Sequence, residues 1–371
     1  MKNRKKILYF VSEDWYFVSH RIELAKEAKK KGYEVTLLAN MDKEKDYIES
    51  AGIKTIHLPI QRSKKNLIND FFLLLKAYKI INKEKPNILH CVSLKPILYG
   101  TICSRVLGKI KVINTFAGLG VLINYQNNSL KRKIINIFLR LFIKSKSVKI
   151  IVQNQSDKNF FTKNNIVEEK NINLILGSGV DMRKFFPSTE IRKSLNIILV
   201  SRMLWSKGVG EFVEIAKKFK NNELVSFTLL GKTDAKNPDS VPIDFLESLT
   251  SLPNLEWKGH TDNVVKELHR SDIFFLPTSY GEGIPKALIE AAACGLPLVS
   301  SNNSGCLEVV ENNRNGYVIN KQNLEECYDA IKKLIESREL RLKFGKFSRN
   351  KVKEDFSIEN INNETINLYN L

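Results

Sequence analysis

Short apolar runs alternate along the chain with longer segments in which apolar residues recur every three or four positions. In the first half, strands are expected at residues 7–11, 35–39, 53–58, 88–92 and 111–115. In the second half, they are expected at residues 196–200, 226–230, 255–259, 273–277 and 298–300. Continuous apolar runs of this length are typical of parallel strands that are buried on both faces.

Helical patterns fill the segments between these predicted strands. In the first half they cover residues 21–31, 42–51, 67–83 and 96–107. Because strands and helices alternate, the pattern predicts the α/β class, with doubly wound parallel sheets covered by helices on both faces. The alternation of predicted strands and helices is interrupted over residues 181–195. We therefore expect two domains, at 1–182 and 183–355, followed by a helical stretch at about 356–371.

The composition is that of a globular protein large enough for two cores. Of the 371 residues, 43% are hydrophobic and 27% charged, and no apolar run approaches the roughly 18–20 residues that span a bilayer. The run Ile7–Val11 is too short for the apolar core of a signal peptide, so we expect a first strand there and no export signal. The five scattered cysteines form no C-x-x-C pair, which favours a reducing cytoplasm and argues against structural zinc.

The formal net charge of +19 predicts anionic partners, such as nucleic acid, an anionic membrane or phosphorylated substrates. A compositional bias toward Lys, Asn and Ile is the alternative explanation. Nucleic acid is disfavoured, because the chain has no recognised binding motif and no alternation of basic and aromatic residues. The basic stretches Lys64–Lys76 and Leu130–Lys144 predict either helices in an anionic membrane interface or core-packing helices with a solvated face.

The segment after the predicted strand 273–277 carries the first cluster of candidate chemistry. Gly281 and Gly283 open a loop where the backbone can approach a ligand, since neither residue has a Cβ. Pro285 suits the first turn of a helix, and residues 286–293 are strong helix formers. A strand, a glycine loop and a helix N-terminus form the usual place for a phosphate or a sugar in an open α/β sheet, although such a unit is also common scaffold.

Two carboxylates and two cations accompany this unit. Glu282 lies on the loop and Glu290 about two turns into the helix, and a carboxylate can accept the two hydroxyls that a ribose or pyranose ring offers. Arg202 and Lys207 follow the first strand of the second half, and Gly208 then begins a helix. Fixed positive charge at this place suits a diphosphate. Solvated cations and an ordinary surface carboxylate are the alternative explanations.

A third segment, L-G-S-G-V-D at 176–181, is followed by Phe185-Phe186-Pro187. Together the three motifs resemble those of the retaining GT-B glycosyltransferases of family 4, whose corresponding segment usually has N-G-V-D and F-x-P; Ser178 departs from that pattern. The resemblance implies a GT-B fold, with two Rossmann-like domains that face a central cleft. The N-terminal domain would bind the acceptor, the C-terminal domain the donor, and the last helix would cross back onto the first domain.

The resemblance also implies roles for single residues, with no cofactor and no metal, since neither domain has a D-x-D at a strand end. Arg202 and Lys207 would neutralise the leaving nucleoside diphosphate and act in catalysis with Glu282. Glu290 would hold the ribose hydroxyls, and Glu282 with the following backbone amides would hold the donor sugar. The other donor-binding positions are Gly283, Ile284, Pro285, Gly231, Gly259 and His260.

The first domain resembles the family mainly in rhythm. The family often has a histidine near the reaction centre, where this chain has Asn114–Gly120 without one. A retaining mechanism does not require a protein base, because the departing phosphate oxygen can take the acceptor proton while the site stabilises the diphosphate. The candidates for the acceptor side of the cleft are His20, Arg21, His90, Lys95, Gly118 and Gly120. Structural histidines and a simple glycine turn are the alternatives.

The resemblance implies a retaining glycosyltransferase that moves a hexose or N-acetylhexosamine from a UDP-sugar to a polyprenyl-diphosphate-linked saccharide in surface glycan biosynthesis. Trp205–Val209 and the glycine loop look like those of bacterial members that add N-acetylgalactosamine to undecaprenyl-diphosphate acceptors. We then expect a cytoplasmic protein, peripheral on the inner face of the cell membrane. The alternatives are a GT-B enzyme with a soluble acceptor, a UDP-sugar epimerase and a basic nucleic-acid-binding protein.

Overall fold

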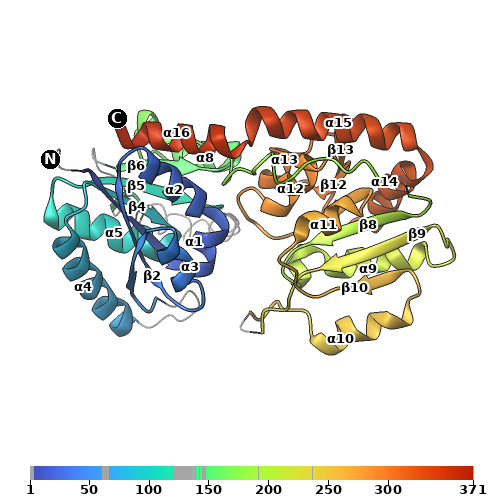
Figure 1. Cartoon of the computed structure of the whole chain (residues 1–371), viewed down its shortest axis with the longest axis horizontal. Helices are drawn as coiled ribbons and strands as arrows, with labels where there is room; N and C mark the ends of the chain where they lie inside the picture. Colours follow the sequence, from blue (N-terminus) through green and yellow to red (C-terminus); the bar gives the residue numbers. More distant parts are fainter. Residues whose placement is uncertain are drawn as a thin grey trace. The chain divides into compact units, whose positions relative to one another are not determined.

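Figure 1 shows a computed structural model of the chain, which describes residues 4–60, 67–119, 137, 139–141, 143, 148–190, 192–235 and 237–370. The chain divides into two compact units. The N-terminal unit comprises Met1–Ser178 and Ile361–Leu371, and the C-terminal unit comprises Gly179–Asn360. Gly120, Lys64, Lys65 and most of the basic stretch 130–144 lie outside the described residues, so the expectations placed on them stay predictions.

The N-terminal unit is built on a seven-stranded parallel sheet with the order β3-β2-β1-β4-β5-β6-β7. Its strands are β1 Lys6–Glu13, β2 Glu34–Asn40, β3 Lys54–His57, β4 Ile88–Val92, β5 Lys111–Phe116, β6 Val148–Val152 and β7 Ile172–Leu174. The strand order reverses between β1 and β4, and the carboxyl ends of strands at such a switch point are where open α/β sheets bind ligands.

Helices cover both faces of this sheet, as Figure 1 shows. They are α1 Asp14–His20, α2 Ile22–Lys30, α3 Lys45–Ser50, α4 Leu67–Glu84, α5 Leu94–Leu107, α8 Gln155–Lys163 and the 3-10 turn Glu169–Asn171. Alternate residues of β1 enter two different cores, because successive side chains of a strand point to opposite faces. Leu8 and Phe10 pack with α4 and α5, whereas Tyr9 packs with α2 and with the C-terminal helix.

The C-terminal helix α16, Ile358–Asn370, begins in the C-terminal unit and ends on the sheet of the N-terminal unit. Ile361, Ile366 and Tyr369 are buried in the core of the N-terminal unit. The Tyr369 hydroxyl also forms hydrogen bonds with Tyr9 Oη, at 2.9 Å, and with His90 Nδ1, at 2.7 Å. The end of the chain is therefore an integral part of the N-terminal fold.

The C-terminal unit holds a six-stranded parallel sheet with the order β10-β9-β8-β11-β12-β13. Its strands are β8 Leu195–Val200, β9 Val225–Leu230, β10 Leu255–Trp257, β11 Ile273–Leu276, β12 Leu298–Ser301 and β13 Gly316–Ile319. Its helices are α9 Val209–Lys218, α10 Ile243–Ser248, α11 Val264–His269, α12 Lys286–Ala293, α13 Ser304–Leu307, α14 Leu324–Glu336 and α15 Arg338–Asp355, with 3-10 turns at Trp205–Lys207 and Leu249–Ser251. The switch point of this sheet lies between β8 and β11.

The expected class, α/β with two doubly wound Rossmann-like sheets, is confirmed by this strand order. The helix expected over 21–31 is confirmed as α2, Ile22–Lys30, whereas the short helix α1 before it was not expected; Arg21, with φ −134° and ψ −14°, separates the two. The strand expected over 255–259 ends at Trp257, since Gly259 has φ +66°. No strand was expected at β6, β7 or β13. Within the described residues, no helix has the length and apolar character needed to cross a bilayer.

Candidate active site

The loops after β8 and β11 meet at the switch point of the C-terminal sheet. The carbonyl oxygen of Ser206, on the first loop, accepts hydrogen bonds from the backbone amides of Ser279 and Tyr280, at 2.8 and 3.0 Å. It also accepts one from the Thr278 hydroxyl, at 3.0 Å. Two of the predicted motifs, about 75 residues apart in sequence, are thereby joined through a single carbonyl group.

Gly208 allows this close approach. Its φ of +84° is in the left-handed region, and a Cβ on it would lie 2.5 Å from the carbonyl oxygen of Pro277. Both the backbone conformation and the contact therefore require glycine. Gly208 ends the 3-10 turn that carries Lys207 and directly precedes α9, so it fixes where the Lys207 side chain leaves the backbone.

Lys207 and Glu282 form an ion pair across the two loops. The Lys207 side chain is 9% exposed and that of Glu282 is 23% exposed. The ammonium group also lies 4.8 Å from the centre of the Tyr280 ring, a cation–π contact. A nearly buried lysine thus has its charge balanced by the carboxylate of the glycine loop, at the place where the sequence predicts a diphosphate and a sugar.

Arg202 pairs with Asp234, with 2.8 Å between Nη1 and Oδ2. Both side chains are about one-third exposed, at 34% and 31%. A second carboxylate from the same segment, Asp239, accepts hydrogen bonds from the Ser206 amide and hydroxyl. The sequence analysis missed both aspartates. The sequence signal that could have found them is their position shortly after β9. Their segment also contains Asn237 and a proline and therefore has turn character.

The glycine loop is closely packed against α13. A Cβ at Gly305 would lie 1.6 Å from the Gly283 carbonyl oxygen, so only glycine allows the two backbones to meet there. Gly283 and Ile284 are buried, and Pro285 directly precedes the first helical residue of α12. The amides of the first turn of α12 are therefore held at the carboxyl end of β11, as the sequence predicts.

Glu290 is the fifth residue of α12, and its side chain is 12% exposed. Burial raises the pKa of its carboxyl group, while the positive charges of Lys286 and Lys184 act in the opposite direction. The Lys286 ammonium lies 3.6 Å from Glu290 Oε1, one helical turn away. The site thus contains a second carboxylate that is shielded from water and only partly neutralised.

Gly231 and Gly259 lie beside the loop of Arg202. The Gly231 amide donates a 2.6 Å hydrogen bond to the Gly259 carbonyl oxygen, and a Cβ at Gly231 would lie 1.7 Å from the Ser201 carbonyl oxygen. A Cβ at Gly259 would meet nothing within 4 Å. His260 is 59% exposed and lies 3.4 Å from the Asp262 carboxylate. All predicted donor-side residues therefore lie in the C-terminal unit, on the loops that follow β8, β9, β10 and β11 or, for Glu290, on α12.

In the N-terminal unit, His90 does not have the surroundings expected of an acceptor-side residue. It is 1% exposed, and its second ring nitrogen, Nε2, forms a 2.8 Å hydrogen bond with the Thr115 hydroxyl. With Tyr369 on Nδ1, both nitrogens are occupied inside the core. Burial, with the nearby charge of Arg21, lowers the pKa of His90 well below its usual value. These surroundings support the structural alternative.

The other N-terminal candidates differ in their surroundings. Lys95 pairs with Asp70 at 2.7 Å, and the Tyr99 hydroxyl donates to the same carboxylate at 2.8 Å, so the Lys95 charge is already balanced. The His20 ring stacks on Tyr16 with 4.3 Å between ring centres. Gly118 has φ +99°, a conformation that favours glycine. Arg21 is buried.

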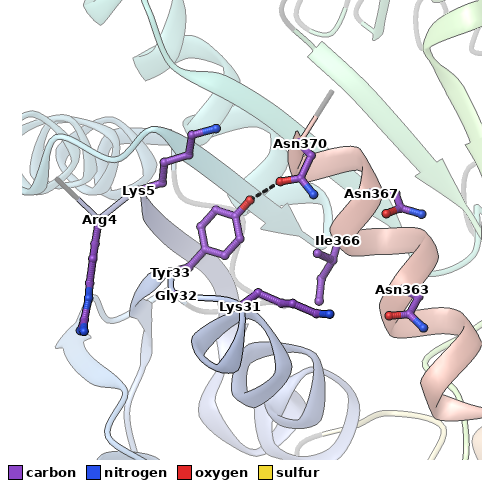
Figure 2. Close-up of a pocket in the computed structure, with 9 residues that line it drawn as sticks. All are labelled: Arg4, Lys5, Lys31, Gly32, Tyr33, Asn363, Ile366, Asn367 and Asn370. Atoms are coloured by element: carbon purple, nitrogen blue, oxygen red, sulfur yellow. Dashed lines mark hydrogen bonds between the residues drawn. The ribbon is translucent and has the colours of Figure 1, made fainter. Parts of the chain in front are cut away.

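A hollow of about 490 Å³ in the N-terminal unit contains none of the predicted site residues. Figure 2 shows it beside α16, where the Tyr33 hydroxyl donates a 2.7 Å hydrogen bond to the side chain of Asn370. Its lining residues are Arg4, Lys5, Lys31, Gly32, Tyr33, Asn363, Ile366, Asn367 and Asn370. Arg4 and Lys5 come just before β1, and Lys31, Gly32 and Tyr33 come just before β2, so the hollow lies at the amino ends of these strands. Ligands of open α/β sheets bind at the opposite, carboxyl ends.

Comparison with known proteins gives family matches for both parts of the chain. Residues 6–154 match the model described as glycosyl transferase 4-like, and residues 181–351 match that of glycosyl transferases group 1. Two doubly wound units with these matches define a GT-B glycosyltransferase. The chain belongs to this family, with a 4-like N-terminal part and a group 1 C-terminal part, and the resemblance expected from its motifs is confirmed.

Two curated relatives cover most of the chain. One is the N,N'-diacetylbacillosaminyl-diphospho-undecaprenol alpha-1,3-N-acetylgalactosaminyltransferase of Campylobacter jejuni, 29% identical over 88% of each chain. The other is the UDP-Gal:alpha-D-GlcNAc-diphosphoundecaprenol alpha-1,3-galactosyltransferase of Escherichia coli, 27% identical over 84% of this chain and 82% of the relative. Both act on undecaprenol-linked acceptors, as their names state.

Solved structures share the fold at low sequence identity. Anabaena HepE in complex with UDP-glucose has a TM-score of 0.79 at 16% identity and covers 99% of this chain and 100% of its own. A glycosyltransferase of Rickettsia africae has a TM-score of 0.76 at 20% identity and covers 99% and 98%. Among the residues that the structure describes, no group of three or more His, Cys, Asp or Glu side chains is placed to hold a metal ion.

Proposed function

We propose that this glycosyltransferase transfers a hexose or N-acetylhexosamine, with retention, from a UDP-sugar to a saccharide on a polyprenyl diphosphate. The observation that carries the donor half of the proposal is the Lys207–Glu282 ion pair between the loops after β8 and β11, with the shielded Glu290 on the helix α12 that follows the second loop. The C-terminal unit binds the donor and the N-terminal unit binds the acceptor.

The donor site combines two kinds of contact that a nucleoside diphosphate sugar needs. Lys207 and Arg202, both at the end of β8, supply positive charge for the diphosphate, and the amides at the start of α12 add to it. Glu290, on the first turns of the same helix, accepts the ribose hydroxyls. HepE, which shares the fold, is solved with UDP-glucose, and the Escherichia coli relative has UDP-Gal in its name; both support UDP as the nucleotide.

The entry of a diphosphate would rearrange the two cation pairs of the apo site. Lys207 would exchange part of its contact with Glu282 for a phosphate oxygen, which frees Glu282 to accept sugar hydroxyls. Arg202, one-third exposed, can turn from Asp234 to the diphosphate at little cost in burial. In the transition state negative charge grows on the leaving diphosphate, so these cations stabilise it more than the ground state.

The acceptor class is inferred from the two curated relatives, whose names specify diphospho-undecaprenol. A polyprenyl chain remains in the bilayer, so the enzyme must work at a membrane surface. We therefore propose that the N-terminal unit binds the membrane through the exposed apolar face of α4, which consists of Ile68, Phe71, Phe72 and Leu75, exposed by 73%, 57%, 56% and 42%. Their spacing places them on one side of the helix.

Charge on α4 fits an anionic bilayer. Its exposed Lys76 and Lys79 follow the apolar face, while its two acidic residues are paired, Asp70 with Lys95 and Glu84 with Lys54. Apolar side chains that enter the headgroup region next to exposed lysines are the usual features of an interfacial helix.

The donor half is tested by UDP release from a panel of UDP-sugars, with and without EDTA, in the presence of a lipid extract. We expect release from one sugar, unchanged by EDTA and lost in Glu290→Ala and in Lys207→Ala. Glu336→Ala and Lys217→Ala, at exposed ion pairs of the same unit, are the matched controls. Equal activity in the site variants and the controls would refute the assigned site.

The membrane half is tested by co-sedimentation with vesicles of phosphatidylglycerol and of phosphatidylcholine. We expect salt-sensitive binding to the anionic vesicles that is lost when Phe71 and Phe72 are both replaced by Ser. Leu342→Ser removes an equally exposed apolar side chain from α15 and should leave binding unchanged. Binding that survives in the double variant would place the membrane contact elsewhere.

A further inference from the structure

Arg21 is a buried cation at the break between α1 and α2. The residue is only 5% exposed. One guanidinium nitrogen, Nη1, donates a weak 3.3 Å hydrogen bond to the carbonyl oxygen of His20. The other two, Nε and Nη2, are buried and have no hydrogen-bond partner among the residues that the structure describes.

No carboxylate balances this charge. Arg21 takes part in no ion pair within the described part of the chain, and the residues outside it include no Asp or Glu, as the sequence shows. The titratable groups on which its charge acts are Tyr9, His90 and Tyr369. The two phenols are neutral at physiological pH, and His90 is buried and hydrogen-bonded on both nitrogens.

Such a charge is costly unless something else neutralises it. Arginine stays protonated in proteins, so Arg21 cannot escape the cost by losing its proton, as a buried lysine can. A bound water molecule could accept a hydrogen bond from Nε or Nη2, but it brings no counter-charge. An unpaired buried ion costs several kcal/mol in typical proteins, on the order of the stability of a whole domain.

The two unpartnered donors are also arranged for a particular kind of ligand. Nε–H and one Nη2–H lie on the same edge of the planar guanidinium and point in parallel, the geometry with which arginine binds two oxygens of one phosphate. Arg21 directly precedes α2, whose nine residues extend from Ile22 to Lys30, so the positive end of that helix adds to the same field.

We propose that Arg21 binds two oxygens of a phosphate group in the N-terminal unit and that this group belongs to the diphosphate of the lipid-linked acceptor. The second half rests on the proposed function. The first half does not, because the unpaired charge and the free guanidinium edge are properties of the apo unit alone.

The anion site is tested with inorganic pyrophosphate on a chain in which the donor site has been disabled by Arg202→Ala and Lys207→Ala. In that background, Arg21 is compared with Arg21→Gln and Arg21→Lys. Lys31→Gln, in the basic hollow of Figure 2, controls for unspecific binding to surface cations. The readouts are thermal unfolding with and without pyrophosphate and the ¹⁵N–¹H signal of the Arg21 Nε group.

We expect pyrophosphate to stabilise the Arg21 and Lys31→Gln chains, to shift the Arg21 Nε signal, and to bind at least about tenfold more weakly to Arg21→Gln. Arg21→Lys should bind with intermediate affinity, because it keeps the charge and loses the two-donor edge. Without anion, Arg21→Gln should be no less stable than Arg21, since it removes an unpaired charge. An Nε signal that does not respond, with the same pyrophosphate effect in Arg21→Gln, would overturn the site.

A second comparison identifies the source of the phosphate and uses the chain with its donor site intact. Farnesyl diphosphate, orthophosphate and UDP are compared as competitors of pyrophosphate at the Arg21 signal. Stronger competition by farnesyl diphosphate supports the acceptor assignment, whereas equal competition by orthophosphate indicates a site for free phosphate and overturns that half. UDP release by Arg21→Gln is also measured in the presence of EDTA and without acceptor. Release in this assay shows that the donor site works, so a negative result at the Arg21 signal then concerns the acceptor assignment and not the proposed donor site.

Discussion

Lys207 and Glu282 form an ion pair that links the loop after β8 to the glycine loop after β11. The pair is largely shielded from water, and it joins the cation and the carboxylate to which the family resemblance assigns the diphosphate and the sugar of the donor. Removing one partner leaves the other charge buried and unpaired, which costs more than the pair itself contributes. The two residues are therefore coupled in stability as well as in binding.

A double-mutant cycle measures this coupling. Lys207→Met and Glu282→Gln should each destabilise the chain to urea, and the double variant should recover part of the loss, with a coupling energy of about 1–3 kcal/mol. The exposed pair Lys217–Glu214, with side chains 49% and 50% exposed, should give a coupling below about 0.5 kcal/mol. Additive effects at the first pair would show that the Lys207 and Glu282 charges do not stabilise each other and would contradict the coupling.

Glu290→Gln should make the chain more stable and less able to bind UDP. Burial raises the pKa of the Glu290 carboxyl group, so the unfolded chain loses the carboxyl proton at lower pH than the native chain does. At neutral pH the charged carboxylate therefore lowers the stability of the native chain. We expect a rise in Tm of about 2–4 °C at pH 7.5 and a roughly 10–100-fold loss of UDP affinity.

The matched control for Glu290→Gln is Glu336→Gln. Glu336 has a lysine at the same i,i+4 spacing, at 3.9 Å, but its side chain is 62% exposed. This variant should change neither Tm nor UDP affinity. If Glu290→Gln behaved in the same way as the control, Glu290 would be an ordinary helix-surface carboxylate, and the assignment of the ribose contact would fail.

Gly208→Ala should be far more destabilising than Gly259→Ala. Both positions have positive φ, +84° and +66°, so both substitutions carry a backbone cost of about 1–2 kcal/mol. Only the Gly208 Cβ would meet backbone, 2.5 Å from Pro277, which adds about 1–3 kcal/mol of overpacking. Urea unfolding of the two variants should therefore differ by that second amount, and equal midpoints would mean that the two loops separate readily.

Local sequence predicts the scaffold of this site well, because it depends on neighbouring residues. The helix expected at 286–293 has the bounds of α12, and the strand before it is β11 to within a residue. Pro285 marks its start, and Gly295 with Pro297 marks its end. The break at Arg21 carries no such signal, since neither glycine nor proline marks it.

Contacts between distant residues are what the sequence leaves open. Asp234 is 32 residues from its partner Arg202, and Tyr369 is 279 residues from His90. No periodicity links such pairs, so the sequence could propose His90 as a cleft residue, whereas the structure places it in the core. The strands β6, β7 and β13 were missed as well, although β11, which has four residues like β13, was expected.

His90 should make the stability of the N-terminal unit depend on pH below about neutrality. Its pKa is held well below 6.5, first by burial and then by the charge of Arg21, so in acid the unfolded chain binds a proton that the native chain does not. The stability that the neutral His90 ring gives the native chain is therefore complete above pH 6.5. It is lost as the pH falls, by about 1.4 kcal/mol per pH unit.

Urea unfolding at pH 7.5 and pH 5.5 measures this dependence. His90→Gln keeps a hydrogen-bonding side chain but cannot take up the proton, so its stability should fall less between the two pH values than that of the unmodified chain. His260→Gln is the control, because it replaces a histidine that is 59% exposed and lies in the other unit. Parallel losses in the unmodified chain and in His90→Gln would contradict this prediction and mean that His90 binds its proton equally well in the native and unfolded chains.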